Sequence, residues 1–141
     1  MTGNMTPPPL RFYSIVLAVA DLSLMQHWYA RALGFAERLS GASEADGTAF
    51  AVMDGAGTCI ELVARRGATP APPPEPPTHL DTTGWRTLDL ESDDLLALDA
   101  HLRREGVTIL TAMQPLSPRR AMTVIRDPEG NLIAIFGPVP G

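Results

Sequence analysis

Cysteine is nearly absent from the sequence, since Cys59 is the only one in 141 residues. A disulfide within the chain is therefore impossible, and this composition fits the reducing environment of the cytoplasm. Basic residues are also few: 11 Lys and Arg stand against 16 Asp and Glu, which gives a net charge of −5. Nucleic acid is disfavoured as a partner, because binding to phosphates requires a basic surface.

Long apolar runs are missing as well. No segment approaches the roughly 20 apolar residues that span a membrane, and the opening stretch MTGNMTPPPL lacks the basic and apolar regions of a signal peptide. Apolar residues nevertheless make up 45% of the chain, which is enough for the core of a compact protein. We therefore expect a folded cytoplasmic protein with no membrane partner.

What the sequence does contain is a long internal repeat. The segment DGAGTCIELV at 54–63 returns as DPEGNLIAIF at 127–136, and SIVLAVADL at 14–22 returns as TLDLESDDL at 87–95. The two pairs share one offset, and a long repeat with few identical residues indicates duplicated modules. The copies differ at one position that concerns function, because the first carries Glu61 where the second carries Ala134.

Each copy predicts the same succession of helix and strands. In the first, Asp21 is a residue type that caps helices, and Gly34 is a typical C-terminal stop. In the second, Asp93 or Asp94 is the expected cap and Gly106 the stop. The expected strands are residues 12–20, 36–42, 48–54 and 58–64, and then 85–91, 107–112, 120–126 and 131–136. The order βαβββ therefore occurs twice, which predicts an α+β fold.

Proline is concentrated between the two copies, in the segment PAPPPEPP at 70–77. This composition predicts a stiff, polyproline-like spacer outside the core. The expected boundaries are a disordered N-terminal extension at 1–10, a first module at 11–66, a linker at 67–83 and a second module at 84–138.

The motifs of the two copies, in this order, resemble those of the vicinal oxygen chelate superfamily, which includes glyoxalase I, bleomycin resistance proteins and extradiol dioxygenases. The resemblance rests on VADL and WYARALGF in the first copy and on DDL, REGV and DPEGNLIAIF in the second, over about residues 11–137. It implies that two βαβββ modules curve their mixed sheets into a cup for a small molecule. Because this fold hosts many chemistries, the resemblance does not fix the activity.

The resemblance also implies where a metal would bind. Metal-binding members take their ligands, often His and Glu, from the first and last strand of each module, and the matching residues here are Ser14, Glu61, Thr87 and Ala134. A transition metal usually needs three or more nitrogen, sulfur or carboxylate donors, so hydroxyl groups are poor substitutes. We therefore expect a metal-lacking branch of the superfamily, with no metal and no other cofactor.

The three histidines do not supply the missing ligands. His27 and His101 fall on the expected helices, where we expect solvated side chains. His79 falls in the linker, which could fold over a cup, so a degraded metal site using Glu61, His79 and water stays open as a weaker interpretation.

Strand alternation predicts which side chains face the cup. Glu61 and Asp89 are the candidate catalytic residues, since two carboxylates in one apolar cup can divide the roles of acid and base; alternatively both are only solvated. Trp85 is either a stacking surface for a planar ligand or a packing residue, and Cys59 is expected to pack with no base or cation nearby. The expected ligand-binding residues are Ser14, Val16, Cys59, Glu61, Trp85, Thr87, Asp89, Leu132 and Phe136.

Two classes of function fit these residues. The first is a metal-independent protein of the bleomycin-resistance type that binds an apolar or planar small molecule. The second is a metal-free isomerase, lyase or cyclase in which Glu61 is the general base. In either case two open sheets leave free edges, so we expect a homodimer, and the linker could permit exchange of modules between chains.

Overall fold

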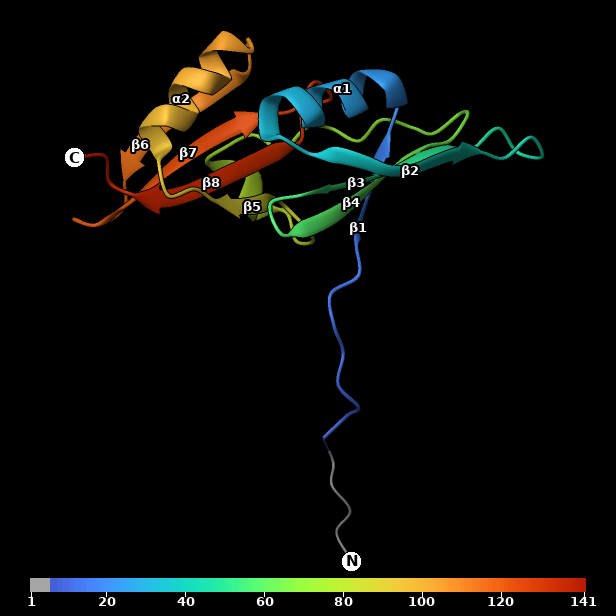
Figure 1. Cartoon of the computed structure of the whole chain (residues 1–141), viewed down its shortest axis with the longest axis horizontal. Helices are drawn as coiled ribbons and strands as arrows, with labels where there is room; N and C mark the ends of the chain where they lie inside the picture. The colour runs from blue at the N-terminus through green and yellow to red at the C-terminus, as the bar shows by residue number, and fades with distance from the viewer. Residues whose placement is uncertain (1–5) are drawn as a thin grey trace, which may run out of the picture.

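The computed structural model of the chain describes residues 6–141, so the expected N-terminal extension at 1–10 lies partly outside the described residues. The helices and strands form two groups (Figure 1). The first contains β1 (Ile15–Val19), α1 (Leu22–Leu33), β2 (Ala36–Ala42), β3 (Ala49–Gly55) and β4 (Thr58–Ala64). The second contains β5 (Leu88–Glu91), α2 (Leu95–Arg104), β6 (Thr108–Pro115), β7 (Arg120–Arg126) and β8 (Leu132–Pro138). Both groups have the order βαβββ, so the predicted α+β fold of two modules is confirmed.

Each module forms one four-stranded sheet with the same topology. The strand order is β1-β4-β3-β2 in the first sheet and β5-β8-β7-β6 in the second. The first strand of each module runs parallel to the last, and the other neighbours are antiparallel, so both sheets are mixed. The registers follow the internal repeat, since Ile15 pairs with Ile60 and Leu88 pairs with Ile133. Within their sheets, β1 and β5 are edge strands that have a neighbour on one side only.

These two edge strands are shorter than the sequence predicted. β1 starts at Ile15 rather than at residue 12, and β5 starts at Leu88 rather than at residue 85. Before β5 the chain turns at Gly84, whose φ is 117°, and Arg86 Nε donates to the carbonyl oxygen of His79 at 2.8 Å. This segment is therefore tied to the linker instead of extending the sheet.

Both helices begin at capping residues that the sequence singled out. Asp21 Oδ1 accepts a hydrogen bond from the backbone N–H of Leu24 at 3.0 Å. At the second helix the cap is Asp94 rather than Asp93, and its Oδ1 accepts from the N–H of Ala97 at 2.9 Å. A glycine in the left-handed region lies just beyond the end of each helix, as expected for a helix stop.

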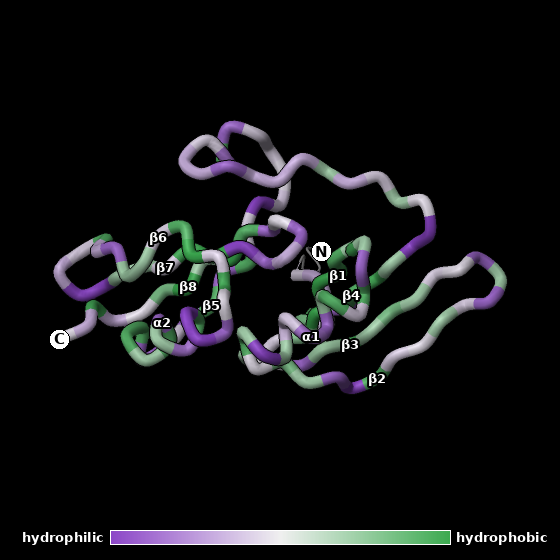
Figure 2. The backbone as a smooth tube through the Cα atoms, turned by 90° about the horizontal axis from the view of Figure 1, so that it is seen from above, coloured by the Kyte–Doolittle hydropathy of each residue, from purple (hydrophilic) through white to green (hydrophobic). Residues whose placement is uncertain are grey.

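The core lies between the helices and one face of each sheet. Both helices cover the same side of the sheets, and the opposite faces are open (Figure 1). Met25, Leu62, Leu102 and Ile133 are fully buried members of the core. Figure 2 shows the apolar strands of both modules beside the more polar linker, which runs along one side of the molecule. No helix in the described part of the chain is long and apolar enough to cross a membrane.

The turn between β7 and β8 joins the two modules. The hydroxyl of Tyr29 on α1 donates to Asp127 Oδ2 at 2.9 Å, and both residues are buried. The carboxylate of Glu129 accepts the N–H groups of Ala20 and Asp21, each at 2.8 Å, at the start of α1. A carboxylate is favourable there, because the first N–H groups of a helix lack partners and the helix dipole is positive at that end.

Asp127 is held by several donors at once. Besides Tyr29, it accepts hydrogen bonds from the backbone N–H groups of Glu129 and Asn131 and from the side-chain amide of Asn131. Burial, followed by the negative charge of Asp127, raises the pKa of Tyr29. The hydroxyl therefore stays protonated and keeps donating.

We predict that Tyr29→Phe destabilises the protein by about 1.5–3 kcal/mol, the usual contribution of a hydrogen bond to a charged group. The reason is that the buried Asp127 carboxylate loses a donor. Denaturant unfolding measures the change. Tyr13→Phe is the matched control, because Tyr13 is exposed and makes no hydrogen bond among the described residues. Equal stability of the two variants would contradict the role assigned to Tyr29.

Candidate functional site

The open face of the first sheet carries a half-buried carboxylate. Glu61 on β4 alternates with Ile60 and Leu62, which are buried in the core against α1, so its side chain points to the open face. The strand registers place Glu61 beside Val16 of β1 and Val52 of β3. Glu61 makes no hydrogen bond or ion pair with any residue between 6 and 141. It is therefore a carboxylate among apolar neighbours that is available to a ligand.

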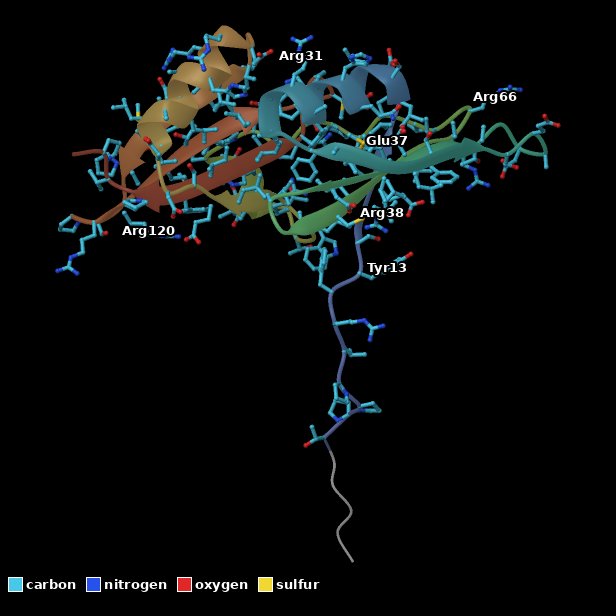
Figure 3. The ribbon with its side chains drawn as sticks, in the orientation of Figure 1. Tyr13, Arg31, Glu37, Arg38, Arg66 and Arg120 are labelled. Carbon is cyan, nitrogen blue, oxygen red and sulfur yellow. The ribbon has the colours of Figure 1, made fainter. Side chains whose placement is uncertain are left out.

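Cys59, two residues before Glu61 and on the same face, belongs to a polar cluster. Arg38 Nε and Nη2 donate to the two carboxylate oxygens of Asp54 at 2.8 and 2.7 Å, and Arg38 Nη2 lies 3.4 Å from Cys59 Sγ. The expectation that no cation lies near Cys59 is therefore wrong. Figure 3 shows Arg38 on the side of the first sheet that faces away from α1.

Arg38 reaches this face because β2 is irregular. The register between β2 and β3 shifts between Glu37 and Leu39, and such a bulge redirects the side chain of the extra residue. Hydrogen bonds from Arg38 lower the pKa of Asp54. Burial raises the pKa of the Cys59 thiol, and the nearby Arg38 offsets only part of that shift.

A cleft of about 450 Å³ opens between the two modules. Its walls come from the start of β1, the turn between β3 and β4, and strands β5, β7 and β8. The lining residues are Ile15, Ala56, Thr58, Leu88, Asp89, Leu90, Glu91, Arg120 and Phe136. A mainly apolar hollow with a few polar groups is the usual composition of a small-molecule site.

Of the charged side chains that line the cleft, Arg120 and Glu91 form an ion pair and Asp89 does not. Arg120 Nη2 donates to Glu91 at 2.7 Å, and its guanidinium lies 5.9 Å from the centre of the Phe136 ring. Figure 3 shows Arg120 at the far side of the second module from Arg38. Asp89 accepts a hydrogen bond from the Thr87 hydroxyl at 2.7 Å and forms no ion pair with any described residue. Asp89 is thus the carboxylate of the cleft that has no cationic partner among the described residues.

The structure divides the predicted site residues between the two sheets. Those on the first sheet are Val16, Cys59 and Glu61, and those on the second sheet or just before it are Thr87, Asp89, Leu132 and Phe136. Only Asp89 and Phe136 line the cleft. Within one chain, the two candidate catalytic carboxylates therefore lie on different sheets.

Three further predicted site residues, Ser14, Trp85 and Leu132, differ in how far they are exposed to solvent. Ser14 is half-buried just before β1, and Trp85 is fully exposed before β5. Leu132 is buried opposite Arg126, whose Nη2 donates to Glu75 of the linker at 2.9 Å. The linker therefore reaches the second sheet beside Leu132.

The four positions at which the resemblance leads us to expect metal ligands do not offer a suitable donor set. Ser14 and Thr87 supply hydroxyls, Ala134 supplies a methyl group, and only Glu61 supplies a carboxylate. Within residues 6–141, no group of three or more His, Cys, Asp or Glu side chains is arranged to hold a metal ion. These residues do not fit a divalent transition metal.

No histidine completes a group of three ligands within residues 6–141. His101 is half-buried, and its Nε2 lies 2.9 Å from the carbonyl oxygen of Arg31, a contact that the expectation of a solvated side chain did not include. His27 is exposed, as expected. His79 lies in the short 3₁₀ helix η1 (Thr78–Asp81), and its Nδ1 is buried without a hydrogen-bond partner among the described residues.

We predict that alkylation of Cys59 by iodoacetamide keeps accelerating above about pH 8.5, the usual pKa of a thiol. The reason is that burial raises the pKa of Cys59, and the thiolate is the reactive form. The chain has no other cysteine, so mass spectrometry reports this site alone. In Arg38→Met the rise should move to still higher pH. A rate that levels off below the usual thiol pKa would contradict the raised value.

Comparison with known proteins places the sequence in one protein family. A family model described as the Glyoxalase/Bleomycin resistance protein/Dioxygenase superfamily matches residues 11–135. A glyoxalase family protein from Bacillus cereus is 17% identical with a TM-score of 0.76, over 98% of this chain and 100% of that one. A glyoxylase/bleomycin resistance protein/dioxygenase domain from Frankia sp. EAN1pec is 22% identical with a TM-score of 0.70, over 95% and 100%.

A third similar structure is that of an enzyme. Glyoxalase I from Leishmania major, described as trypanothione-dependent, is 19% identical with a TM-score of 0.71, over 92% of this chain and 87% of that one. At these identities the likeness shows the fold alone. No curated protein matches the chain significantly in sequence.

Proposed function

Since the chain belongs to the glyoxalase/bleomycin resistance protein/dioxygenase superfamily, we propose that it binds a small organic molecule without the help of a metal ion. The observation that carries the proposal is the chemistry at the four positions that hold metal in other members. Three of them, Ser14, Thr87 and Ala134, have lost a strong donor. The Thr87 hydroxyl is instead engaged with Asp89.

The open faces of the two sheets supply the proposed binding surface. On the first, Glu61 stands among valines and has no partner among the described residues. On the second, the cleft combines leucine side chains and the Phe136 ring with the unpaired Asp89. An apolar or planar ligand with a cationic or hydrogen-bond donating group suits both surfaces. Trp85 would stack on such a ligand and Ser14 would hydrogen-bond to it, whereas Thr87 would only accept a hydrogen bond, because its hydroxyl donates to Asp89.

The alternative is a metal-free isomerase, lyase or cyclase. It is favoured by the state of Glu61, a half-buried carboxylate that no neighbouring donor occupies. Such a group can remove a proton from a bound substrate, with Asp89 or a hydroxyl as its partner. The two proposals place the same residues at the site and differ in whether a bond is broken.

We expect the working unit to be a homodimer in the cytoplasm. Because Glu61 and Asp89 lie on different sheets, and β1 and β5 have free edges, we propose that a second copy covers the open faces of the first. The single cysteine fits a reducing compartment.

We predict that Glu61→Gln weakens binding of a planar cationic dye, acridine orange, by about 10- to 100-fold, because it removes a charge-assisted contact of about 1.5–3 kcal/mol. The amide keeps the shape of the side chain. Fluorescence titration measures the affinity. Glu44→Gln is the matched control, since Glu44 is exposed and has no partner among the described residues.

The outcomes separate the two classes of function. Unchanged dye affinity in both Glu61→Gln and Trp85→Ala would contradict the assigned site. If a substrate is found and Glu61→Gln abolishes its turnover while its binding is retained, the enzyme is supported over the binding protein.

A further inference from the structure

The cleft between the two modules holds charges of both signs. The charged residues of its lining are Asp89, Glu91 and Arg120. Asp89 and Glu91 are two positions apart on β5, so their side chains leave the same face of the strand. Figures 1 and 3 show Arg120 on the side of the second sheet that faces away from α2, which is the open face. One cation and two carboxylates therefore share one hollow.

The guanidinium of Arg120 is held from two directions and keeps donors to spare. Its Nη2 donates to Glu91 Oε2 at 2.7 Å, and its central carbon lies 5.9 Å from the centre of the Phe136 ring. The bond to Glu91 is the only hydrogen bond that the Arg120 side chain makes among the described residues. Because a guanidinium carries several N–H groups in a fixed plane, the others can donate to a ligand.

Asp89 supplies the opposite charge. Its Oδ1 accepts a hydrogen bond from the Thr87 hydroxyl at 2.7 Å, and its Oδ2 has no partner among the described residues. Asp89 is exposed and forms no ion pair within residues 6–141. A cationic group of a ligand can therefore reach this carboxylate and bind it by a charge-assisted hydrogen bond.

The spacing of the two charged groups matches that of an amino acid. Each residue of a strand adds about 3.3 Å, so the side chains of Asp89 and Glu91 leave β5 about 6.6 Å apart. Because Arg120 bonds to Glu91, its guanidinium lies at roughly this distance from Asp89. In an α-amino acid one carbon atom joins the ammonium and carboxylate groups, and with a hydrogen bond at each end the molecule spans about 7–8 Å.

The remaining walls of the cleft are mainly apolar. Ile15 comes from β1, Leu88 and Leu90 come from β5, and Phe136 comes from β8. The hollow of about 450 Å³ lies within the range of about 300–1,000 Å³ that small-molecule pockets have. Aliphatic walls and an aromatic ring favour a ligand whose side chain is apolar or aromatic.

We propose that the cleft binds an α-amino acid with an apolar side chain, whose ammonium group bonds to Asp89 and whose carboxylate bonds to Arg120. The inference rests on the proposed function and deepens it, because it names the class of small molecule that the protein holds without a metal. Glu91 orients the guanidinium, and Phe136 packs against the side chain of the ligand.

A ligand with a single charge fits the cleft less well. A simple cation satisfies Asp89 but lies near the guanidinium of Arg120, and like charges repel. A simple carboxylate meets Arg120 but lies near Asp89 and Glu91. In a zwitterion each charge lies beside its opposite. Recognition of both charges at once is therefore the property to test.

Three small compounds test both contacts on the natural protein. L-phenylalanine carries both charges, phenethylamine lacks the carboxylate, and 3-phenylpropionate lacks the ammonium group. We expect L-phenylalanine to bind at least about tenfold more tightly than either of the others, the effect of losing one charge-assisted hydrogen bond. Titration followed by NMR measures the three affinities. Absence of L-phenylalanine binding, or equally tight binding of phenethylamine, would overturn the inference.

Two substitutions assign each contact to its residue. We expect Asp89→Asn to weaken L-phenylalanine and phenethylamine about tenfold and to leave the affinity for 3-phenylpropionate unreduced. Arg120→Met should weaken L-phenylalanine and 3-phenylpropionate and leave the affinity for phenethylamine unreduced. If either substitution leaves the affinity for L-phenylalanine unchanged, the inference is wrong.

Matched controls separate these contacts from a general effect of charge. Asp93→Asn and Arg119→Met remove the same charges from residues that are exposed and outside the cleft lining. Neither side chain has a partner among the described residues. We expect both controls to bind L-phenylalanine as the natural protein does. A loss of affinity in the controls equal to that in the cleft variants would contradict the assigned site.

The dye experiment and these titrations fail separately. If acridine orange binds through Glu61 and L-phenylalanine does not bind, the proposed function stands and the amino-acid site is contradicted. If L-phenylalanine binds through Asp89 and Arg120 and the dye does not bind, the cleft site stands and the role of Glu61 is contradicted.

Discussion

The buried carboxylate of Asp127 is the group on which the arrangement of the two modules depends. It accepts the hydroxyl of Tyr29 from α1 while its own turn supplies the remaining donors. Glu129 of the same turn accepts two N–H groups at the start of α1. A buried charge is tolerated only when it is fully hydrogen-bonded, so this turn fixes how the first helix sits against the second module. The two open faces, and the cleft between them, follow from that orientation.

The two copies of the repeated turn have taken different roles. In the second copy Asp127 faces inward and joins the modules, whereas in the first copy Asp54 pairs with Arg38 beside Cys59 on the open face. The strands that follow the two turns also differ in polarity at matching positions. The first carries Glu61, which has no partner among the described residues, and the second carries the buried Ala134. A duplicated module has thus kept its fold twice and has placed its polar groups asymmetrically. The asymmetry supports a site that binds a small molecule without a complete set of metal ligands.

The parts of the structure that depend on local pattern were predictable from the sequence. Strand alternation, the cap at Asp21, a cap at Asp93 or Asp94 and the glycines after the helices predicted both βαβββ modules, because these signals act over a few residues. Contacts between distant segments were not predictable. Arg38 lies near Cys59 at a bulge in β2, and Arg86, which the sequence placed in a strand, bonds instead to the linker. His101 looked like a solvated helix residue, yet its ring contacts the carbonyl oxygen of Arg31 in the other module.

The proposed function requires that Ser14, Thr87 and Ala134 stand where other members of the superfamily have metal ligands, and that the fold is kept without the metal. Calorimetric titration with Zn²⁺ of the natural chain and of the triple variant Ser14→His/Thr87→His/Ala134→Glu tests this claim most directly. We expect no specific binding to the natural chain and stoichiometric binding to the triple variant, which carries a His or Glu at each of the four positions that the resemblance points to. Tight, stoichiometric binding of Zn²⁺ to the natural chain would contradict the account.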